Sequence, residues 1–316
     1  MNFEAPSWDN DLPPSVEIIE VGPRDGFQNL PDFVETELKV RIIEQLLQAG
    51  IQRMEVTSFV HPQAVPQMRD ADEVLKGVKD TRCQCFAMVP NLIGAERAIE
   101  AGAEMLNLVV SASESHNRSN VRKGVDDSLR SFKAVFDLAE ENGVPVRASI
   151  ATAFGCPFEG AVPIDRVLHV AGELTEMGCV ELNLCDTTGM ANPRQVARLT
   201  RRMLDSFGDT QITMHFHNTR GAGMANLLSA IETGATSFET SFGGLGGCPF
   251  APGAAGNVCT EDAVHMLHEM GVSTGIGLPR LLDAVREAER ALGTRFPGQV
   301  IKAGRSCDLH PLPNKT

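Results

Sequence analysis

Residues 164–186 read IDRVLHVAGELTEMGCVELNLCD, and this stretch contains one full unit of the pattern that decides the fold. Its apolar residues first recur at the spacing of one face of an α-helix, at Val167, Val170, Leu174 and Met177. Gly178 follows, as glycine often does where a helix ends. The apolar run 179–185 comes next and predicts a buried strand. The stretch therefore predicts a helix that leads directly into a strand.

The same alternation runs along the whole chain. Short apolar runs rich in Val, Ile and Met lie at 16–21, 53–59, 83–89, 105–111, 146–152, 179–185, 211–217 and 236–241. Segments with helical spacing separate them, and several of these segments end in glycine, at Gly50, Gly102, Gly143, Gly178 and Gly234. Eight alternations of strand and helix predict a parallel sheet and favour an α/β fold of the closed (β/α)8 TIM barrel type. An open doubly wound sheet is the alternative, which is weakened because no G-x-G-x-x-G pattern follows the first run.

The domain organisation expected from this pattern is simple. The 316 residues fit one barrel domain, with the barrel at about 16–275. A helix over 281–291 and an irregular tail then form a short C-terminal helical extension at about 276–316. The sequence contains no recognisable linker, so we expect residues 1–316 to form a single domain.

The composition excludes several classes of partner. Hydrophobic residues make up 42% of the chain, which is enough for a large core. A net charge of −13 argues against a nucleic-acid partner, because phosphates are neutralised by clustered Lys and Arg. We expect no membrane span, since no apolar run approaches ~20 residues. The first fifteen residues carry three acidic and no basic side chains, unlike a targeting peptide, so we expect a cytoplasmic protein.

Polar residues gather where the predicted strands end. The active sites of such barrels lie at the C-terminal ends of the strands. Read in order, these ends supply Arg24, Asp25, Glu55, Asn91, Ser111, Thr152, Asp186, His215 and His217, and a glycine-rich stretch from Gly243 to Asn257 follows the last strand. Chance would have spread such residues over both ends of the strands, so we predict an active site here.

His215 and His217 predict a metal site. Alternate side chains of a strand point the same way, so both imidazoles can share one ligand. An isolated pair of this kind is more often structural, but burying two imidazoles beside Asp25 requires a shared reason, which a cation supplies. With the Asn257 amide, this donor set suits Mg2+ or Mn2+, and Fe2+ or Zn2+ stay open.

Arg24 and Asp186 allow two interpretations each, and one cysteine differs from the others in its surroundings. Arg24 either forms an ion pair with Glu55 at the barrel mouth or polarises a carbonyl and stabilises the enolate formed from it. Asp186 is either a turn residue or part of the site. Eight scattered cysteines without a C-x-x-C pair indicate reduced thiols, but Cys248 lies between glycine and proline, where packing gives it no evident purpose.

Several motifs together resemble one known family. They are GPRDGFQN at 22–29, TSFV at 57–60 with VPQM at 65–68, GCPFEG at 155–160, HFH at 215–217, and GLGGCPF at 244–250 continuing to Asn257. Over about residues 16–300 they closely resemble 3-hydroxy-3-methylglutaryl-CoA lyase, which belongs to a wider group of metal-dependent lyases and synthases on TIM barrels. The Arg-Asp pair and the Gly-Gly-Cys-Pro loop are the most specific elements.

The resemblance implies a role for each matching residue. The divalent-metal ligands, normally to Mg2+ or Mn2+, would be Asp25, His215, His217 and Asn257. Arg24 would stabilise a thioester enolate and Cys248 would protonate it. The residues that would position the site are Glu55, Asp186, Gln28 next to the metal, and Glu20 near Arg24.

The implied reaction is the retro-aldol cleavage of a 3-hydroxyacyl-CoA, with 3-hydroxy-3-methylglutaryl-CoA giving acetyl-CoA and acetoacetate. The general base stays open among Asp25, His215 and a hydroxide at the cation. Asn218-Thr219-Arg220-Gly221 departs from the family pattern, in which an aromatic residue stands in place of Arg220. The substrate could therefore also be citramalyl-CoA, methylmalyl-CoA or a longer-branched glutaryl-CoA. A condensing enzyme of the isopropylmalate synthase type, which usually carries a long regulatory region, and a noncatalytic barrel that binds metal or CoA stay open as well.

Coenzyme A needs cations for its phosphates. The segment after the fourth strand offers Arg118, Arg122 and Lys123, although such a run can also be a solvated face. In the tail, Cys307 is expected to be a surface thiol. Because barrel lyases of this type are often dimers, we expect a homodimer.

Overall fold

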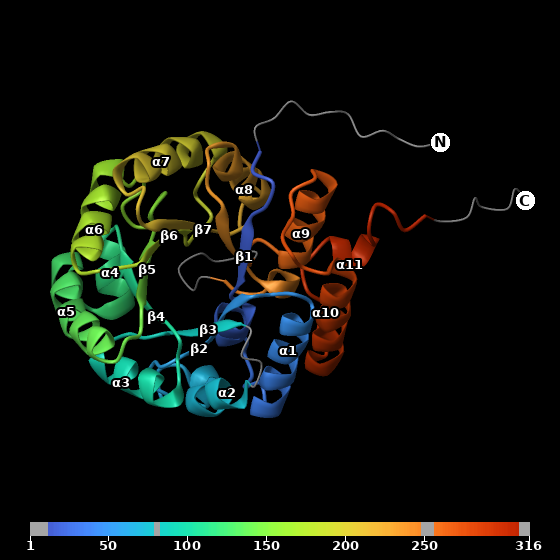
Figure 1. The fold of residues 1–316 in the computed structure, drawn as a ribbon, viewed down its shortest axis with the longest axis horizontal. Helices are drawn as coiled ribbons and strands as arrows, with labels where there is room; N and C mark the ends of the chain where they lie inside the picture. The colour runs from blue at the N-terminus through green and yellow to red at the C-terminus, as the bar shows by residue number, and fades with distance from the viewer. Residues whose placement is uncertain (1–11, 79–82, 248–255, 310–316) are drawn as a thin grey trace, which may run out of the picture.

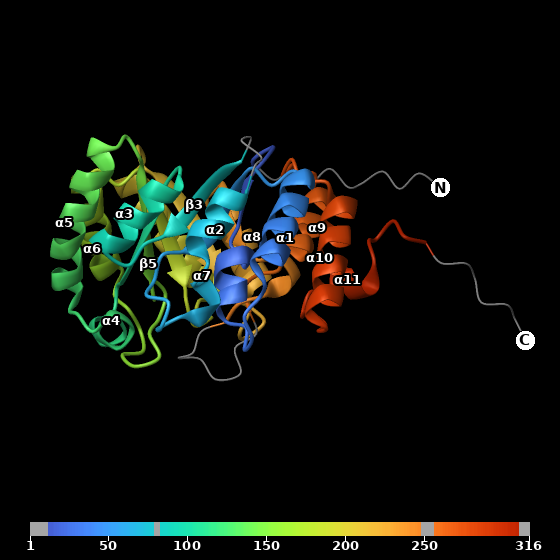
Figure 2. The same cartoon turned by 90° about the horizontal axis from the view of Figure 1, so that it is seen from below.

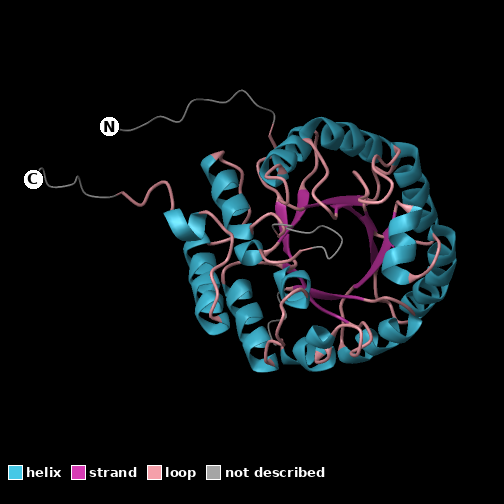
Figure 3. Ribbon diagram, turned by 180° about the vertical axis from the view of Figure 1, so that it is seen from behind, coloured by secondary structure: helices cyan, strands magenta, loops and turns pink. Residues whose placement is uncertain are grey.

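Eight parallel strands form a closed barrel in which each strand pairs with the next one along the chain and β8 pairs with β1. The computed structural model describes residues 12–78, 83–247 and 256–309. Seen along the barrel, the strands form an inner ring surrounded by helices (Figures 1 and 3). The strands are β1 (Glu17–Glu20), β2 (Arg53–Ser58), β3 (Gln84–Met88), β4 (Leu106–Ser111), β5 (Val146–Ala151), β6 (Glu181–Asp186), β7 (Gln211–Phe216) and β8 (Ser237–Thr240).

Helices cover the outside of this ring. Between successive strands lie α1 (Thr36–Gln48), α2 (Ala71–Gly77), α3 (Leu92–Ala101), α4 (Glu114–Val121) with α5 (Val125–Glu141), α6 (Ile164–Glu176), α7 (Pro193–Ser206) and α8 (Gly223–Glu232). After β8 come α9 (Thr260–Glu269), α10 (Leu278–Leu292) and α11 (Val300–Ala303). Short turns are η1 (Gly22–Gly26), η2 (Pro66–Met68) and η3 (Phe242–Gly244). α10 packs against α1, and both lie on the side of the barrel from which the C-terminal segment leaves (Figure 2).

The unit 164–186 shows why the pattern folds in this way. The face of α6 that carries Val167, Val170 and Leu174 is fully buried against the sheet. Gly178 adopts φ +96°, a conformation that releases the chain from the helix into β6. Leu182 and Leu184 of β6 belong to the large core between strands and helices. The alternate residues of β6 supply polar side chains to the interior of the barrel.

The predicted fold is confirmed, including all eight strands with their ends within two residues. The helix expected over 281–291 is α10, so the C-terminal helical extension is also confirmed. The extent of one domain over 1–316 stays a prediction. Among the described residues, no helix combines the length and apolar character needed to cross a membrane.

The segment after β4, from which the sequence predicted charged residues but no helix, contains the helix α4. Ser113 caps this helix, since its Oγ accepts the N–H of His116, and Glu114 pairs with Arg118 one turn on. The helix is polar on nearly every side and buries only His116 and Asn117. It therefore lacks the apolar stripe from which a helix is predicted.

Candidate active site

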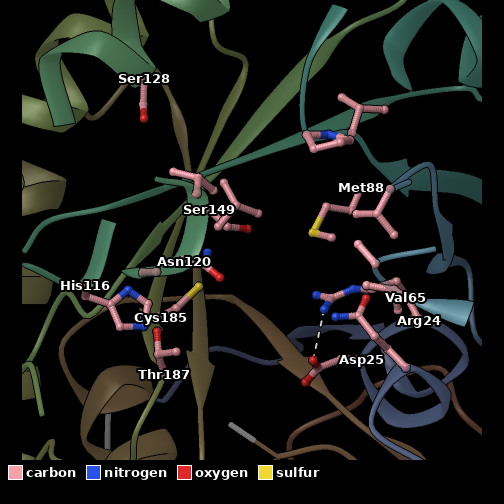
Figure 4. Close-up of a pocket in the computed structure, with 18 of the residues that line it drawn as sticks. Arg24, Asp25, Val65, Met88, His116, Asn120, Ser128, Ser149, Cys185 and Thr187 are labelled. Atoms are coloured by element: carbon pink, nitrogen blue, oxygen red, sulfur yellow. Dashed lines mark hydrogen bonds and ion pairs between the residues drawn. The ribbon is translucent and has the colours of Figure 1, made fainter. Parts of the chain in front are cut away.

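Arg24 and Asp25 lie in η1, a single π-helical turn directly after β1. The Asp25 N–H donates to the carbonyl of Val21 at 2.7 Å, which fixes the turn at the end of the strand. Gly22 begins the turn, and any side chain there would overlap the ring of Phe242. The close packing of the turn onto η3 places Asp25 at the cavity in the barrel mouth (Figure 4).

The two imidazoles come from β7 and the residue after it. His215, His217 and Asp25 are all buried, and their ligand atoms lie within 4.8 Å of one another. His215 Nδ1 lies 2.8 Å from Glu239 Oε2, so the Nδ1–H donates to this carboxylate and Nε2 is left as the ligand atom. The three residues form a group that could hold a metal ion.

Asn257, which follows β8, lies beside Asp25, which follows β1. Its Nδ2 donates to Asp25 Oδ2 at 2.6 Å and to the Leu245 carbonyl at 3.0 Å. Asn257 Oδ1 and His217 Nδ1 are buried and have no hydrogen-bond partner among the described residues. Buried polar atoms without partners are rare, so these two atoms fit a site that binds an ion.

The charges of Asp25 and His217 match what metal ligands need. Burial disfavours the ionised carboxylate, but Arg24 and the two imidazoles outweigh burial and hold the pKa of Asp25 below its usual range. Burial and the neighbouring His215 lower the pKa of His217 to about 3, so this imidazole is neutral. For His215, burial is outweighed by the hydrogen bond and charge of Glu239, and its pKa is raised.

Arg24 is held from two sides. Its Nε donates to Glu55 Oε2 at 2.5 Å and its Nη1 to Asp25 Oδ1 at 2.9 Å. The ion pair with Glu55 that the sequence suggested is therefore present, and Glu55 itself is fully buried on β2. Within the described part of the chain, no hydrogen bond engages Nη2, so this nitrogen can donate to a bound molecule.

Asp186 ends β6 and serves the turn that follows. Its Oδ1 accepts the N–H groups of Met190 and Ala191 at 2.7 and 3.0 Å, so the turn role is confirmed. Its Oδ2 is buried without a partner among the described residues. Burial outweighs the two backbone hydrogen bonds and raises the pKa of Asp186 to about 6. Arg220, the departure from the family pattern, donates to the carbonyls of Thr188 and Gly189 in the same turn.

A cavity of about 670 Å³ extends from Asp25, His215 and His217 toward α4 and α5. Arg24 and Asp25 lie on one side of it, and Cys185, Thr187 and Ser149 on the other (Figure 4). Gln28 lines it with a buried Oε1 that has no partner among the described residues. All three predicted cations, Arg118, Arg122 and Lys123, are exposed, but only Lys123 belongs to the described lining of the cavity.

Glu20 is not bound to Arg24, because its carboxylate accepts the N–H groups of Gly22 and Phe242 and the hydroxyl of Thr260. Cys248 lies outside the described residues, directly after Gly247, which lines the cavity.

The sequence reasoning missed Glu239, the partner of His215. Glu239 lies in the middle of the apolar run of β8 and is 3% exposed. Arg147 Nη1 donates to its Oε1 at 2.6 Å, and this charge outweighs burial and holds the pKa of Glu239 far below its usual range. A glutamate inside a buried strand requires a partner, and this requirement was the signal that could have identified it.

Comparison with known proteins gives consistent results. The family model HMGL-like matches residues 15–287. The hydroxymethylglutaryl-CoA lyase YngG of Bacillus subtilis is 43% identical over 295 residues, which cover 93% of this chain and 99% of the relative. An (R)-citramalyl-CoA lyase of Chloroflexus aurantiacus is 42% identical over 301 residues, which cover 92% of this chain and 95% of the relative.

A solved structure resembles the whole chain. The HMG-CoA lyase of Acinetobacter baumannii, in complex with coenzyme A and 3-methylmalate, superposes with a TM-score of 0.92 at 44% identity. The superposition covers 95% of this chain and 98% of that one. The chain therefore belongs to the HMGL-like family, as a carbon–carbon lyase of the hydroxymethylglutaryl-CoA lyase type.

Proposed function

We propose that this protein cleaves 3-hydroxy-3-methylglutaryl-CoA to acetyl-CoA and acetoacetate in a retro-aldol reaction that depends on a divalent metal. The observation that carries the proposal is the position of Arg24 beside the buried Asp25, His215 and His217 at the cavity. A cationic donor adjacent to a metal-binding group can stabilise an enolate next to an ionising hydroxyl. The relatives named as lyases of this ester support the choice of substrate.

The donor set of the site favours Mg2+ or Mn2+. Asp25, His215, His217 and Asn257 would hold the ion through one carboxylate, two imidazoles and an amide oxygen, and the set contains no thiolate. When bound there, a divalent cation supplies Lewis acidity that lowers the pKa of a substrate hydroxyl.

The residues of the chain would then carry the proton and the charge. A base takes the hydroxyl proton, the bond between C2 and C3 breaks, and the electron pair moves into the thioester enolate. Arg24 would donate from Nη2 to the enolate oxygen, while Glu55 and Asp25 fix its other nitrogens. Asp25 and His215 are the candidate bases within the group. We propose Cys248, on the strength of the motif alone, as the donor of the proton that returns to C2.

A second substrate is supported by one specific observation. The (R)-citramalyl-CoA lyase relative is nearly as similar in sequence as the hydroxymethylglutaryl-CoA lyase. Both esters share the 3-hydroxyacyl thioester and the remote carboxylate, and cleavage of the second yields pyruvate in place of acetoacetate.

An assay on both esters separates the two. Purified protein with Mn2+ is expected to release acetoacetate from the glutaryl ester with a kcat/KM at least about 10-fold above that for pyruvate release from citramalyl-CoA. His217→Ala should abolish both reactions, because it removes a ligand from the metal-binding group. A preference for citramalyl-CoA would replace the proposed substrate, and no cleavage of either ester would reject the reaction.

We propose that Lys123 binds the phosphates of coenzyme A and that Arg118 and Arg122 add a weaker attraction. Lys123 is the only one of the three on the described cavity wall. Lys123→Glu should raise KM for the ester by about 10-fold and leave kcat unchanged. Arg118→Glu is the matched control, since Arg118 pairs with Glu114 and is 64% exposed. An equal effect of both changes would indicate general attraction without a specific contact.

Assembly and compartment stay predictions. We expect a homodimer, which size-exclusion chromatography with light scattering would test, and we expect the cytoplasm, which fractionation of cells would test.

A further inference from the structure

A chain of hydrogen bonds runs through the interior of the barrel from Arg24. Arg24 Nε donates to Glu55 Oε2 at 2.5 Å, and Asn107 Nδ2 donates to Glu55 Oε1 at 2.7 Å. Ser149 Oγ then donates to Asn107 Oδ1 at 3.1 Å. Three strands, β2, β4 and β5, are linked in this way behind the cavity.

The chain continues to the opposite side of the metal-binding group. Asn183 Nδ2 donates both to Ser149 Oγ at 3.1 Å and to Glu239 Oε2 at 2.9 Å. The same Glu239 oxygen accepts from His215 Nδ1 at 2.8 Å. We call Glu55, Asn107, Ser149, Asn183 and Glu239 the interior belt. It begins at Arg24, which holds Asp25, and it ends at His215.

Asn107 and Asn183, like Glu55, lie behind the wall of the cavity, beyond the reach of a ligand bound there. Asn107 is 1% exposed and Asn183 is 0% exposed, and neither lines the cavity, whereas Ser149 does. Arg147 anchors the far end, because its Nη1 donates to Glu239 Oε1 at 2.6 Å and its guanidinium lies 4.7 Å from the ring centroid of Phe86. The position of Glu239 is therefore fixed by Arg147 as well as by Asn183 and His215.

A buried network of polar side chains is an inefficient way to stabilise a fold. Buried amides and hydroxyls gain little over apolar side chains of similar volume even when every bond is made, and they cost free energy when one is lost. Their advantage is geometric, since each member has at least two hydrogen-bond partners that restrict its orientation. Cleavage requires Arg24 and the metal-binding group to act on adjacent atoms, and small misplacements there reduce rates strongly.

We propose that the interior belt sets the position of Arg24 and Asp25 relative to His215, so that Asn107 and Asn183 are positioning residues for the proposed cleavage. This inference rests on the proposed function for its kinetic consequence. Its consequence for metal affinity is independent of the substrate, because Asp25 and His215 are both members of the metal-binding group.

The test is a double-mutant cycle of Asn107→Leu and Asn183→Leu with two readouts. Each single change should lower kcat by about 10- to 100-fold with KM for the CoA ester within about 2-fold, since neither residue touches the cavity. Each should also raise the Kd for Mn2+, measured by titration without substrate, by about 10-fold. The double variant should lie within about 2-fold of the weaker single variant in both quantities, because either change already interrupts the belt.

The inference would be overturned if the effects of the two changes on the Kd for Mn2+ multiplied in the double variant. If the Asn107 change disturbed only Arg24 and Asp25, and the Asn183 change only His215, the double variant would bind Mn2+ about 100-fold more weakly. Wild-type metal affinity in either single variant would overturn it as well. The Mn2+ measurement decides the matter even if the protein cleaves neither ester, so failure of the proposed function is seen separately.

Thr213→Val is the matched control inside the same barrel. Thr213 is fully buried on β7, where its hydroxyl lies within hydrogen-bond distance of Glu181 Oε1 and Ser237 Oγ, at 2.7 and 2.9 Å, outside the interior belt. Its replacement should lower the unfolding midpoint while kcat and the Kd for Mn2+ stay unchanged. If either leucine variant does not fold, Asn107→Ser and Asn183→Ser complete the cycle, because serine is too short to bridge the same partners.

Discussion

Glu20 shows how one buried carboxyl can connect segments that are far apart in the chain. Its Oε1 accepts the N–H groups of Gly22 and Phe242 at 2.7 and 2.9 Å, and its Oε2 accepts the hydroxyl of Thr260 at 2.7 Å. The first of these precedes Arg24 in η1, and the other two open η3 and α9. Burial outweighs the hydrogen bonds and raises the pKa of Glu20 to about 8. At neutral pH the group is therefore mostly protonated.

Glu20→Gln tests this protonation state. A carboxyl whose folded pKa is raised adds stability that is complete below its unfolded pKa and is lost as the pH rises through the folded value of about 8. Glutamine does not titrate and keeps the shape of the neutral acid. From about pH 5 to about pH 8, the wild-type free energy of unfolding should fall relative to that of the variant, at up to about 1.4 kcal/mol per pH unit. Urea unfolding measures the difference, and parallel pH profiles would contradict it.

At this scale the sequence predicted residues whose chemistry is visible in their type. Asp25, His215 and His217 were found because imidazoles at alternate strand positions have few purposes. The roles of Asn183 and Glu239 were not predicted, because they depend on which side chains face these residues across the barrel. The partners of Glu20 could not be predicted for the same reason, since Phe242 and Thr260 lie 222 and 240 residues further along the chain.

The turn η3 and the glycines after it form the element that closes over the metal-binding group. Gly246 adopts φ +106°, and a Cβ there would lie 2.5 Å from Asn257 Nδ2 and 2.9 Å from Asp25 Oδ2. The segment can pass this close to two proposed ligands only because it carries no side chain there. Glycine at position 246 is therefore a requirement of the site.

Gly246→Ala should displace Asn257 from Asp25. We expect kcat/KM to fall by about 100-fold and the Kd for Mn2+ to rise, as measured by steady-state kinetics and titration. Gly102→Ala is the control, because Gly102 adopts φ +93° at the end of α3 but meets no heavy atom within 4 Å. It should share the loss of stability from backbone strain and keep full activity. Equal losses of activity would show that strain, and not the contact with Asn257, limits the site.

Elements with a regular apolar pattern were predicted well. Every strand was found because the side chains that it packs against the helices make a short run rich in apolar residues. α4 was missed because its helix depends on a Ser113 cap and on polar pairs, neither of which produces a periodic signal.

At the scale of the whole molecule, ring closure brings the ends of the barrel sequence together. β1 pairs with β8 over the full length of both strands, from Glu17 with Ser237 to Glu20 with Thr240. Asp25 follows the first of these strands, and Asn257 follows the last. The eightfold alternation predicted this closure, but the distances within the site required the structure.

Metal binding should therefore stabilise the entire barrel. An ion that binds only the folded chain at about 100 times its Kd adds about 2.7 kcal/mol to the free energy of unfolding. Calorimetry with and without Mn2+ should show a single transition that moves to higher temperature. His217→Ala should remove the shift without a comparable loss in the metal-free protein. A shift that persists in this variant would place the ion elsewhere.

The pairing of β1 with β8 forms the seam at which the barrel closes, and this seam has a consequence for biosynthesis. The ribosome releases Asp25 early, but its amide partner Asn257 emerges only after the eighth strand has been made. Until then the nascent polypeptide lacks both the seam and the pocket that the seam completes. A nascent polypeptide that ends before Asn257 therefore lacks one of the four proposed metal ligands, and we expect it to be inactive.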